Sequence, residues 1–242
     1  MSKLAMMIAA LCLSGGALAA DIEAMLKKAD SFRMPDASAQ LQTEVQTIKN
    51  GQVDKSKRYE VLVRPGGQSL VLFRSPGESG QKVLMKGDDF WMLMPGSARP
   101  IRITPLQKLL GDAATGDIAT MTWAGDYDGV LRQETEIDGQ PCWELDLSAR
   151  RPALSYQKIT LFLAKRDGRP LRADLYASSN RKLKSARYEL EQRDGRLQVT
   201  RTYLSDAIQT QRETVIHVLS STPKKFGDEL FNPMYLSRSD IK

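Results

Sequence analysis

Residues 159–177 have the sequence ITLFLAKRDGRPLRADLYA, in which two apolar-rich runs flank Asp167-Gly168. The Asp-Gly pair favours a tight reversal of the chain, because both residue types tolerate a positive φ. Short apolar-rich runs bounded by such a turn are typical of β-strands. The stretch therefore predicts an antiparallel hairpin formed by Ile159–Ala164 and Leu171–Ala177.

The same arrangement recurs along the chain. Asp138-Gly139 and Asp194-Gly195 also lie between strand-like runs. Further runs bounded by Gly, Pro or Asp are Leu41–Thr47, Tyr59–Val63, Leu70–Phe73, Val83–Met85, Phe90–Met94, Cys142–Leu147, Ala186–Leu190, Leu197–Leu204 and Thr214–Leu219. Consecutive hairpins predict one strongly curved antiparallel sheet. Since no linker or low-complexity tract divides the chain, we expect a single domain.

One helix is expected before the first strand. Ile22, Met25, Leu26 and Ala29 recur at helical spacing, and Pro35 follows them. Apolar residues at this spacing, with lysines and an aspartate between them, predict a short amphipathic helix.

A second departure from the strand pattern is the insertion at residues 104–126. Pro105 suits the first turn of a helix. Leu106, Leu109 and Leu110 follow it on one side, before Gly111 and Gly116 interrupt the segment. A short, Gly-containing insertion in a β-rich chain predicts a lid over the sheet. A packing helix that fills the concave face permanently is an equally weighted alternative.

Residues 1–20, MSKLAMMIAALCLSGGALAA, have the pattern of a secretory signal peptide: a basic start, an apolar run and small residues at the end. The apolar run is shorter than the roughly 20 residues that a membrane-spanning helix needs. A buried N-terminal helix is the alternative. We expect cleavage after Ala19 or Ala20, leaving residues 21–242 as one domain in the periplasm.

The composition of the 242-residue chain limits its partners. Its formal net charge is +6, and the basic residues are spread along the sequence. No nucleic-acid-binding motif is present, so nucleic acid is not an expected partner. Removal of the signal peptide takes away Cys12 and leaves Cys142 alone, which excludes an internal disulfide. We expect a monomer stabilised by its core.

The polar residues do not predict an enzyme. The chain has one histidine, His217, on a strand face with Val215 and Leu219, where a structural role is favoured. Asp126 and Asp128 resemble calcium ligands, but their neighbours add only backbone oxygens and calcium takes about six or more ligands, so a turn is favoured. No catalytic or metal-binding motif is present. We expect no catalysis, cofactor or metal; an enzyme acting on a lipid-like substrate is the weaker alternative.

Apolar surface is the most informative feature. The run Phe90–Met94 is apolar on both strand faces, which indicates burial on both sides. Met85, Met92 and Met94 suit a surface that adapts to varied ligands, although core packing beneath a helix would explain them as well. Trp91 and Trp123 are the aromatic residues that we expect nearest to a ligand.

Four segments resemble a known family. They are Val61–Pro65 (VLVRP), Lys86–Pro95 (KGDDFWMLMP), the block at 99–119 that contains RPIRITP, LLGD and GDIA, and Asp228–Pro233 (DELFNP). On these segments the chain resembles LolA-like periplasmic proteins, in the subgroup of outer-membrane lipoprotein-sorting proteins. The block at 99–119 is the most specific of the four.

The resemblance implies a mainly β fold: an incomplete, half-open antiparallel β-barrel with short helices as a lid over a hydrophobic cavity. It also implies a cavity-facing arginine, which matches Arg64. The expected ligand-binding residues of cavity and lid are Arg64, Phe73, Leu84, Trp91, Leu93, Leu106, Leu109, Leu110 and Trp123.

The function that the resemblance implies is that of a periplasmic carrier or chaperone. Its cargo would be an acylated lipoprotein or another lipid, received from an inner-membrane transporter and passed to an outer-membrane acceptor. The alternative is a lipid-binding sensor or scaffold module of an envelope transporter complex that carries nothing.

Overall fold

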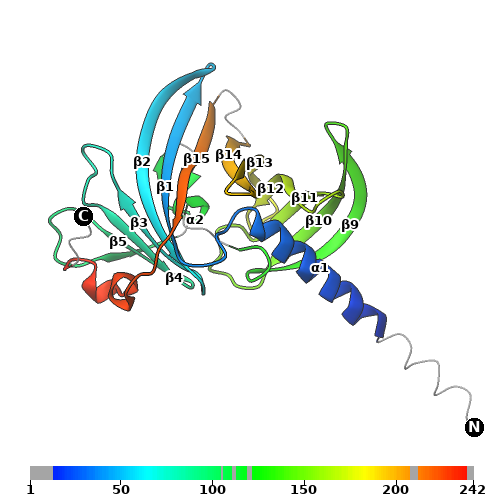
Figure 1. The fold of residues 1–242 in the computed structure, drawn as a ribbon, viewed down its shortest axis with the longest axis horizontal. Coiled ribbons are helices and arrows are strands. Elements are labelled where there is room, and N and C mark those ends of the chain that lie inside the picture. The colour runs from blue at the N-terminus through cyan, green and yellow to red at the C-terminus, as the bar shows by residue number, and fades with distance from the viewer. Residues whose placement is uncertain (1–12, 105, 111–112, 119–121, 208–211, 239–242) are drawn as a thin grey trace, which may run out of the picture.

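The computed structural model describes residues 13–104, 106–110, 113–118, 122–207 and 212–238; the side chains of 13–20, 108–110 and 115 are outside the description. The prediction for residues 1–12 therefore lies outside the described residues. The elements, shown in Figure 1, are α1 (Leu13–Ser31), β1 (Ala39–Lys49), β2 (Gln52–Arg64), β3 (Gln68–Phe73), β4 (Lys82–Lys86), β5 (Asp89–Leu93), β6 (Ile101–Ile103), β7 (Lys108–Leu110), β8 (Ala113–Ala114), α2 (Thr115–Ile118), β9 (Tyr127–Ile137), β10 (Gln140–Ala149), β11 (Lys158–Ala164), β12 (Pro170–Tyr176), β13 (Lys182–Arg193), β14 (Arg196–Asp206), β15 (Arg212–Pro223), and the 3-10 helices η1 (Asp228–Phe231) and η2 (Pro233–Tyr235).

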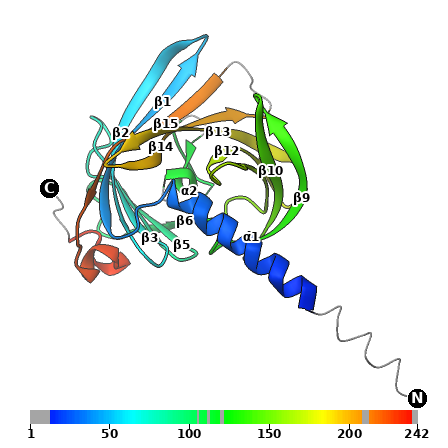
Figure 2. The same ribbon diagram turned by 45° about the vertical axis from the view of Figure 1, so that its right-hand side comes forward.

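Thirteen strands form one antiparallel sheet in the order β6-β5-β4-β3-β2-β1-β15-β14-β13-β12-β11-β10-β9. The pairing of β1 with β15 joins the two halves of the chain. Because β6 and β9 are the two ends of this order, the sheet curves without closing. The predicted half-open antiparallel barrel is confirmed, and Figure 2 shows its concave side with α1 lying across it.

The three predicted Asp-Gly turns form hairpins, but their backbone conformations differ. In Asp138-Gly139 and Asp194-Gly195 both residues have φ between +49° and +76°, as a tight two-residue hairpin turn requires. At the third site only Gly168 has a positive φ, and its N–H donates to the Ala164 carbonyl at 2.8 Å. Asn50-Gly51 forms a further tight turn between β1 and β2, which the sequence analysis missed.

The second half of β2 and the strands β3–β5 are buried on both faces. In β3, Val71 and Phe73 join the large inner core, whereas Leu70 and Leu72 join a separate outer cluster. This alternation confirms the predicted two-sided burial for Phe90–Leu93, since Phe90 faces the inner core and Leu93 the outer cluster. Met94, the last residue of the predicted run, follows β5 and is 44% exposed. Two different segments must therefore cover the two faces of this half of the sheet.

Two helices cover the concave face. The α1 residues Ile22, Leu26 and Ala29 are buried in the inner core, which confirms the predicted amphipathic helix. Gly129 permits the close approach of α1 to β9: a side chain there would come within 2.9 Å of Ile22 and Leu147. The second helix, α2, lies inside the curve of the sheet (Figure 2).

The C-terminal segment covers the opposite face. Residues 224–238, here called the outer strap, run along the outside of β3–β5 (Figure 1). Phe231 and Leu236 of the strap are each 1% exposed and pack against Leu62, Leu70 and Leu84.

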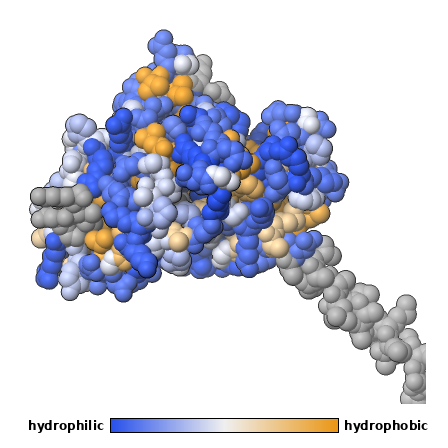
Figure 3. All heavy atoms as spheres, in the orientation of Figure 1, coloured by the Kyte–Doolittle hydropathy of each residue, from blue (hydrophilic) through white to orange (hydrophobic). Residues whose placement is uncertain are grey.

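The remaining outer surface is mainly hydrophilic on the side seen in Figure 3, with hydrophobic residues in small groups. Within the described residues, no helix is long and apolar enough to cross a membrane.

Candidate functional site

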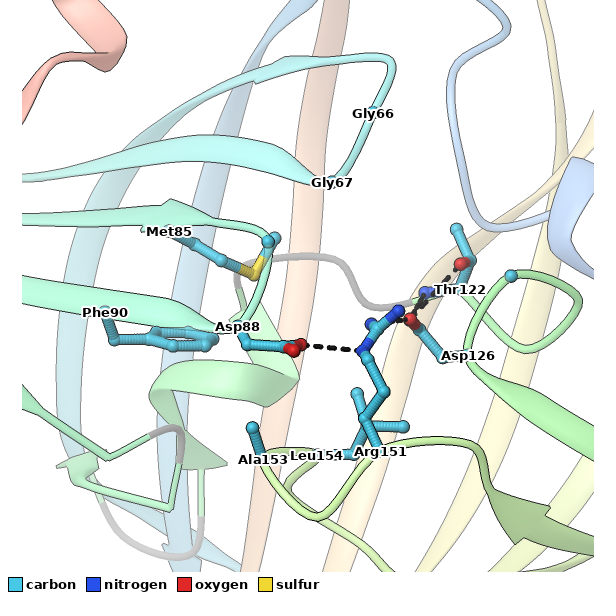
Figure 4. Close-up of a pocket in the computed structure, with 12 residues that line it drawn as sticks. Gly66, Gly67, Met85, Asp88, Phe90, Thr122, Asp126, Arg151, Ala153 and Leu154 are labelled. Atoms are coloured by element: carbon cyan, nitrogen blue, oxygen red, sulfur yellow. Dashed lines mark hydrogen bonds and ion pairs between the residues drawn. The ribbon is translucent and has the colours of Figure 1, made fainter.

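An entrance cleft of about 320 Å³ opens at one rim of the sheet (Figure 4). Four segments far apart in the sequence surround it: the β2–β3 turn, the β4–β5 turn, the loop before β9 and the loop after β10. The lining residues are Gly66, Gly67, Met85, Gly87, Asp88, Phe90, Thr122, Gly125, Asp126, Arg151, Ala153 and Leu154.

Arg151 crosses the cleft and joins two of its walls. Its Nε donates to Asp88 Oδ1 at 2.7 Å, and its Nη2 donates to Asp126. Asp126 also accepts the backbone N–H of Thr122 at 3.1 Å. The side chains of Arg151 and Asp88 are 42% and 41% exposed, so water screens this ion pair, which contributes about 0–1 kcal/mol. The Asp126 side chain is only 13% exposed, so its pair with Arg151 is screened less. The contact with Asp88 can therefore be exchanged at little cost.

The floor of the cleft is apolar. Met85, Phe90 and Leu154 are at most 8% exposed and belong to the inner core. The cleft therefore ends against side chains of the hydrophobic interior of the curved sheet.

A short segment, residues 113–118, fills the middle of that interior; we call it the inner cover. It consists of β8 and α2, and its Ala113, Ala114 and Ile118 are at most 4% exposed. This placement agrees with the alternative in which the 104–126 insertion fills the concave face.

Asp117 holds the inner cover to the sheet. Its Oδ2 accepts from Lys184 Nζ at 2.7 Å and from the Ala114 backbone N–H at 2.8 Å. Its Oδ1 accepts from the Tyr156 hydroxyl at 2.6 Å. The side chains of Asp117 and Lys184 are only 7% and 8% exposed, so the ion pair is buried.

The position of Lys184 is unusual for a lysine. It lies on β13, two and four residues before Ala186 and Tyr188, which pack in or against the inner core. Side chains two residues apart share a face of a strand. The lysine therefore belongs to the concave face, where a charge is costly unless it is paired. Its ammonium also lies 5.4 Å from the centre of the Tyr156 ring.

A second buried carboxylate fixes the end of the insertion to α1. Asp30 accepts the backbone N–H groups of Trp123 and Ala124 at 2.8 and 2.9 Å, and pairs with Arg33 at 3.4 Å. Burial raises the pKa of the Asp30 carboxyl, while Arg33 and the two N–H groups oppose that rise. The Arg33 guanidinium lies 3.8 Å from the centre of the Trp123 ring.

A space of about 60 Å³ remains beside these groups. Both polar and apolar side chains line this space. The polar ones are Arg33, Asp117, Tyr156 and Tyr188, and the apolar ones include Leu175, Leu204 and Ile216. Burial raises the pKa of Tyr188 to about 12, so its hydroxyl stays protonated at neutral pH. The space is large enough for a few water molecules but too small for an acyl chain, so the concave face is closed in this conformation.

The structure separates the predicted ligand-binding residues into two groups. Phe73 and Trp123 lie in the inner core. Leu84 and Leu93 lie in the outer cluster, and Trp91 packs against it. The separation follows from strand alternation, since Leu84, Trp91 and Leu93 point away from the concave side.

Of the three predicted leucines of the insertion, only Leu106 has a described side chain. Leu106 is 46% exposed. Leu109 and Leu110 are in β7, and their side chains lie outside the described residues. A ligand contact for any of them stays a prediction.

Arg64 also lies on the outer side of the sheet. Its Nη1 donates to Asp228 at 2.6 Å, its Nε donates to Gln68 at 2.9 Å, and its guanidinium lies 4.5 Å from the centre of the Phe231 ring. Arg64 follows Val63, which faces the inner core, so it points the opposite way. It contacts the outer strap rather than the inner cover.

Sequence reasoning missed Asp117, Lys184 and Tyr156 as site residues. They come from three distant segments and form no motif. One signal was present: Lys184 occupies the strand face that Ala186 and Tyr188 assign to the core.

The other polar residues considered from sequence have local partners. Asp126 is in a turn and Asp128 is in β9, and each pairs with an arginine. His217 lies opposite Glu44 and Arg201 in the strand register. Burial and the nearby Arg201 and Arg193 lower its pKa. Among the described residues, no cluster of three or more His, Cys, Asp or Glu side chains is arranged to hold a metal ion.

Comparison with known proteins identifies the family of this chain. The chain is 32% identical to a LolA superfamily protein from Nitrosomonas europaea, with a TM-score of 0.80, over 87% of this chain and 96% of that one. A family model described only as an uncharacterized protein matches residues 66–238. No curated protein sequence matches the chain.

Two further solved structures share the fold. A DUF1329 family protein from Desulfovibrio piger is 20% identical with a TM-score of 0.73, over 89% of this chain and 97% of that one. A Vibrio parahaemolyticus domain whose name refers to outer membrane lipoprotein sorting is 18% identical with a TM-score of 0.72, over 89% and 98%.

Proposed function

Because the chain belongs to the LolA superfamily, we propose that it is a non-enzymatic periplasmic carrier that shelters the acyl chains of a cargo on its concave face. One observation carries the proposal: a six-residue segment, residues 113–118, fills the centre of the curved sheet. Withdrawal of this inner cover would open an apolar surface between α1 and the strands. Burial there stabilises the cargo by about 0.8 kcal/mol for each CH₂ group.

The entrance cleft provides the route to that surface. Its floor of Met85, Phe90 and Leu154 is continuous with the inner core. Arg151 crosses the opening, and its ion pair with Asp88 is solvent-exposed, weak and exchangeable. An acyl chain would enter beside Arg151 and take the place of the inner cover.

Export depends on the signal peptide at residues 1–20. Cleavage after Ala19 or Ala20 keeps Ile22, Leu26 and Ala29, the α1 residues that pack in the core. N-terminal sequencing of protein recovered from the periplasm is expected to begin at Ala20 or Asp21. Retention of Met1 in a cytosolic protein would contradict export.

The carrier role requires a donor and an acceptor. An inner-membrane transporter would load the cargo and an outer-membrane site would receive it, with the carrier travelling between them as a monomer. The cargo is a lipid or an acylated lipoprotein.

A closed concave face favours a second candidate, a sensor or scaffold module of an envelope complex that carries nothing. The space left beside Asp117 is about 60 Å³, too small for an acyl chain. In this candidate the inner cover is a permanent part of the core, and the outer surface of the fold meets a partner.

Native mass spectrometry of the protein, purified without detergent from its own periplasm, tests both candidates. A carrier is expected to show a population heavier by the mass of a lipid or an acylated peptide, and the bound species is identified after extraction. A single lipid-free mass, together with a stable complex with a membrane transporter, would replace the carrier by the scaffold.

A further inference from the structure

The inner core contains a set of charges that the shelter of an acyl chain does not explain. Asp30, Arg33, Asp117 and Lys184 lie in or beside it, two negative and two positive. Asp30 belongs to α1 and Arg33 to the turn that directly follows it, so this pair is local in sequence. Lys184 belongs to the sheet, whereas its partner Asp117 belongs to the inner cover.

Movement of the inner cover therefore divides an ion pair. Withdrawal of residues 113–118 takes Asp117 away from a lysine whose side chain is 8% exposed and whose strand neighbours are apolar. A buried charge that loses an ionic partner is disfavoured. An occupant that brings its own negative charge restores the lost attraction, and a neutral occupant does not.

The groups around Asp117 already form a receptor for an anion with two oxygens. Lys184 Nζ donates to one carboxylate oxygen at 2.7 Å, and the Tyr156 hydroxyl donates to the other at 2.6 Å. Burial and the neighbouring Asp117 raise the pKa of Tyr156, which keeps the hydroxyl protonated as a donor. Lys184 is on β13 and Tyr156 is in the loop between β10 and β11, so neither donor belongs to the inner cover.

Building on the proposed carrier function, we infer that the cargo is an anionic amphiphile whose charged group binds Lys184 and Tyr156 in place of the Asp117 carboxylate. The acyl chain of the same molecule fills the apolar space that Ala113, Ala114 and Ile118 occupy in the closed form. The inner cover thus mimics the ligand. Ala113, Ala114 and Ile118 occupy the place of the acyl chain, and the Asp117 carboxylate occupies the place of the charged head group. A fatty acid and a phospholipid with a phosphate head share this chemistry.

One neighbouring carboxylate offers a competing arrangement. Asp206 lies opposite Lys184 in the β13–β14 register. If Asp206 neutralises the lysine once Asp117 has left, the site will accept neutral lipids as well as anionic ones.

The test compares probes that share a sixteen-carbon chain and differ in the charge of the head group. Delipidated protein at pH 8 is titrated with palmitate, hexadecanol and palmitoyl lysophosphatidate below their aggregation limits, with Trp123 in the inner core as the fluorescent reporter. We expect an anionic probe to bind about 10- to 100-fold more tightly than hexadecanol, the range for hydrogen bonds to charged groups. If only palmitate binds tightly, the cargo is a fatty acid. If palmitoyl lysophosphatidate binds tightly as well, the site also accepts a phospholipid head.

The double variant Asp117→Asn/Lys184→Met locates the anion site. It removes both charges together, which is often tolerated in a folded core, and circular dichroism checks the fold. The variant is expected to bind hexadecanol and to lose the preference for palmitate. Lys182→Met is the matched control, because Lys182 is on the same strand and pairs with Asp174 at the surface; its preference is expected to be unchanged.

Each other outcome has a definite meaning. Equal binding of palmitate and hexadecanol by the natural protein would overturn the anionic cargo and leave the carrier function standing. A preference that persists in the double variant would also overturn the inference, because the anion would then bind elsewhere. Failure of all three probes to bind would overturn both.

Discussion

The Asp117–Lys184 ion pair makes opening of the inner cover measurable. Ala114 is 1% exposed, so a thiol placed there by Ala114→Cys reacts with a water-soluble reagent only when residues 113–118 leave the core. Cys142, which is free and fully buried in β10, serves as an internal reference for unfolding of the sheet. We predict that Lys184→Met greatly accelerates labelling at position 114 and leaves Cys142 protected.

The magnitude follows from the contacts of Asp117. Removal of one partner of a buried ion pair costs about 3–5 kcal/mol. We expect the lower end of this range, because Asp117 keeps the Tyr156 hydroxyl and the Ala114 N–H after the lysine amine is removed. A loss of about 3 kcal/mol corresponds to a factor of about one hundred in the population of the open form. Labelling at position 114 should accelerate by that factor.

The control separates the ion pair from a general effect of losing a lysine. Lys182→Met removes a pair with Asp174 in which the lysine side chain is 34% exposed. Such a pair contributes about 0–1 kcal/mol, so acceleration should stay below about fivefold. The reasoning fails if Lys184→Met accelerates labelling no more than Lys182→Met. It also fails if Cys142 becomes reactive in parallel, because the whole sheet would then be unfolding.

Four further predictions test other parts of the structure. Asp30→Ala leaves the N–H groups of Trp123 and Ala124 without their acceptor and should lower the free energy of unfolding in urea by about 1–3 kcal/mol for each group. Phe231→Ala truncates a side chain that is 1% exposed in the outer cluster, and it should lower the free energy of unfolding by about 3–5 kcal/mol in the same assay. Arg64→Leu removes an ion pair with the exposed Asp228, and it should lower the free energy of unfolding by less than about 1 kcal/mol. The pKa of His217 is lower in the folded protein than in the unfolded chain, so the unfolded chain binds more protons in acid. The free energy of unfolding should therefore fall as the pH drops below about 6.5. His217→Gln should make the melting temperature less dependent on pH between 7 and 5. Octanoate should fail to compete with palmitate in the binding assay, even at concentrations that saturate the site with palmitate.

The fold was largely predictable from local patterns. Asp138-Gly139 and Asp194-Gly195 place two turns because their backbone conformation requires residues that tolerate a positive φ. Two-sided burial of Phe90–Met94 follows from the absence of polar alternation. These features depend on residues close together in sequence. The same reasoning would have found the Asn50-Gly51 turn.

The site was much less predictable. Alternation shows that Trp91 and Leu93 are on one face and Phe90 on the other, but it does not say which face is concave. The covering segment decides that question, and the outer strap begins more than 120 residues away from β5. The Asp117–Lys184 pair likewise joins residues 67 positions apart. Such contacts follow from the curvature of the whole sheet, which no short pattern in the sequence contains.

The energy that holds the inner cover is comparable to the energy that a lipid supplies. Burial of Ile118 contributes about 1.5–3 kcal/mol and the two alanines add less, so the ion pair, at about 3–5 kcal/mol for the loss of one partner, is the largest single contribution. Displacement then costs about 5–8 kcal/mol. Burial of a hexadecyl chain yields about 12 kcal/mol and of an octyl chain only about 6 kcal/mol, before the entropic cost of association. A long chain therefore displaces the cover and a short one does not, and an anionic head that restores the ion pair at Lys184 widens that margin.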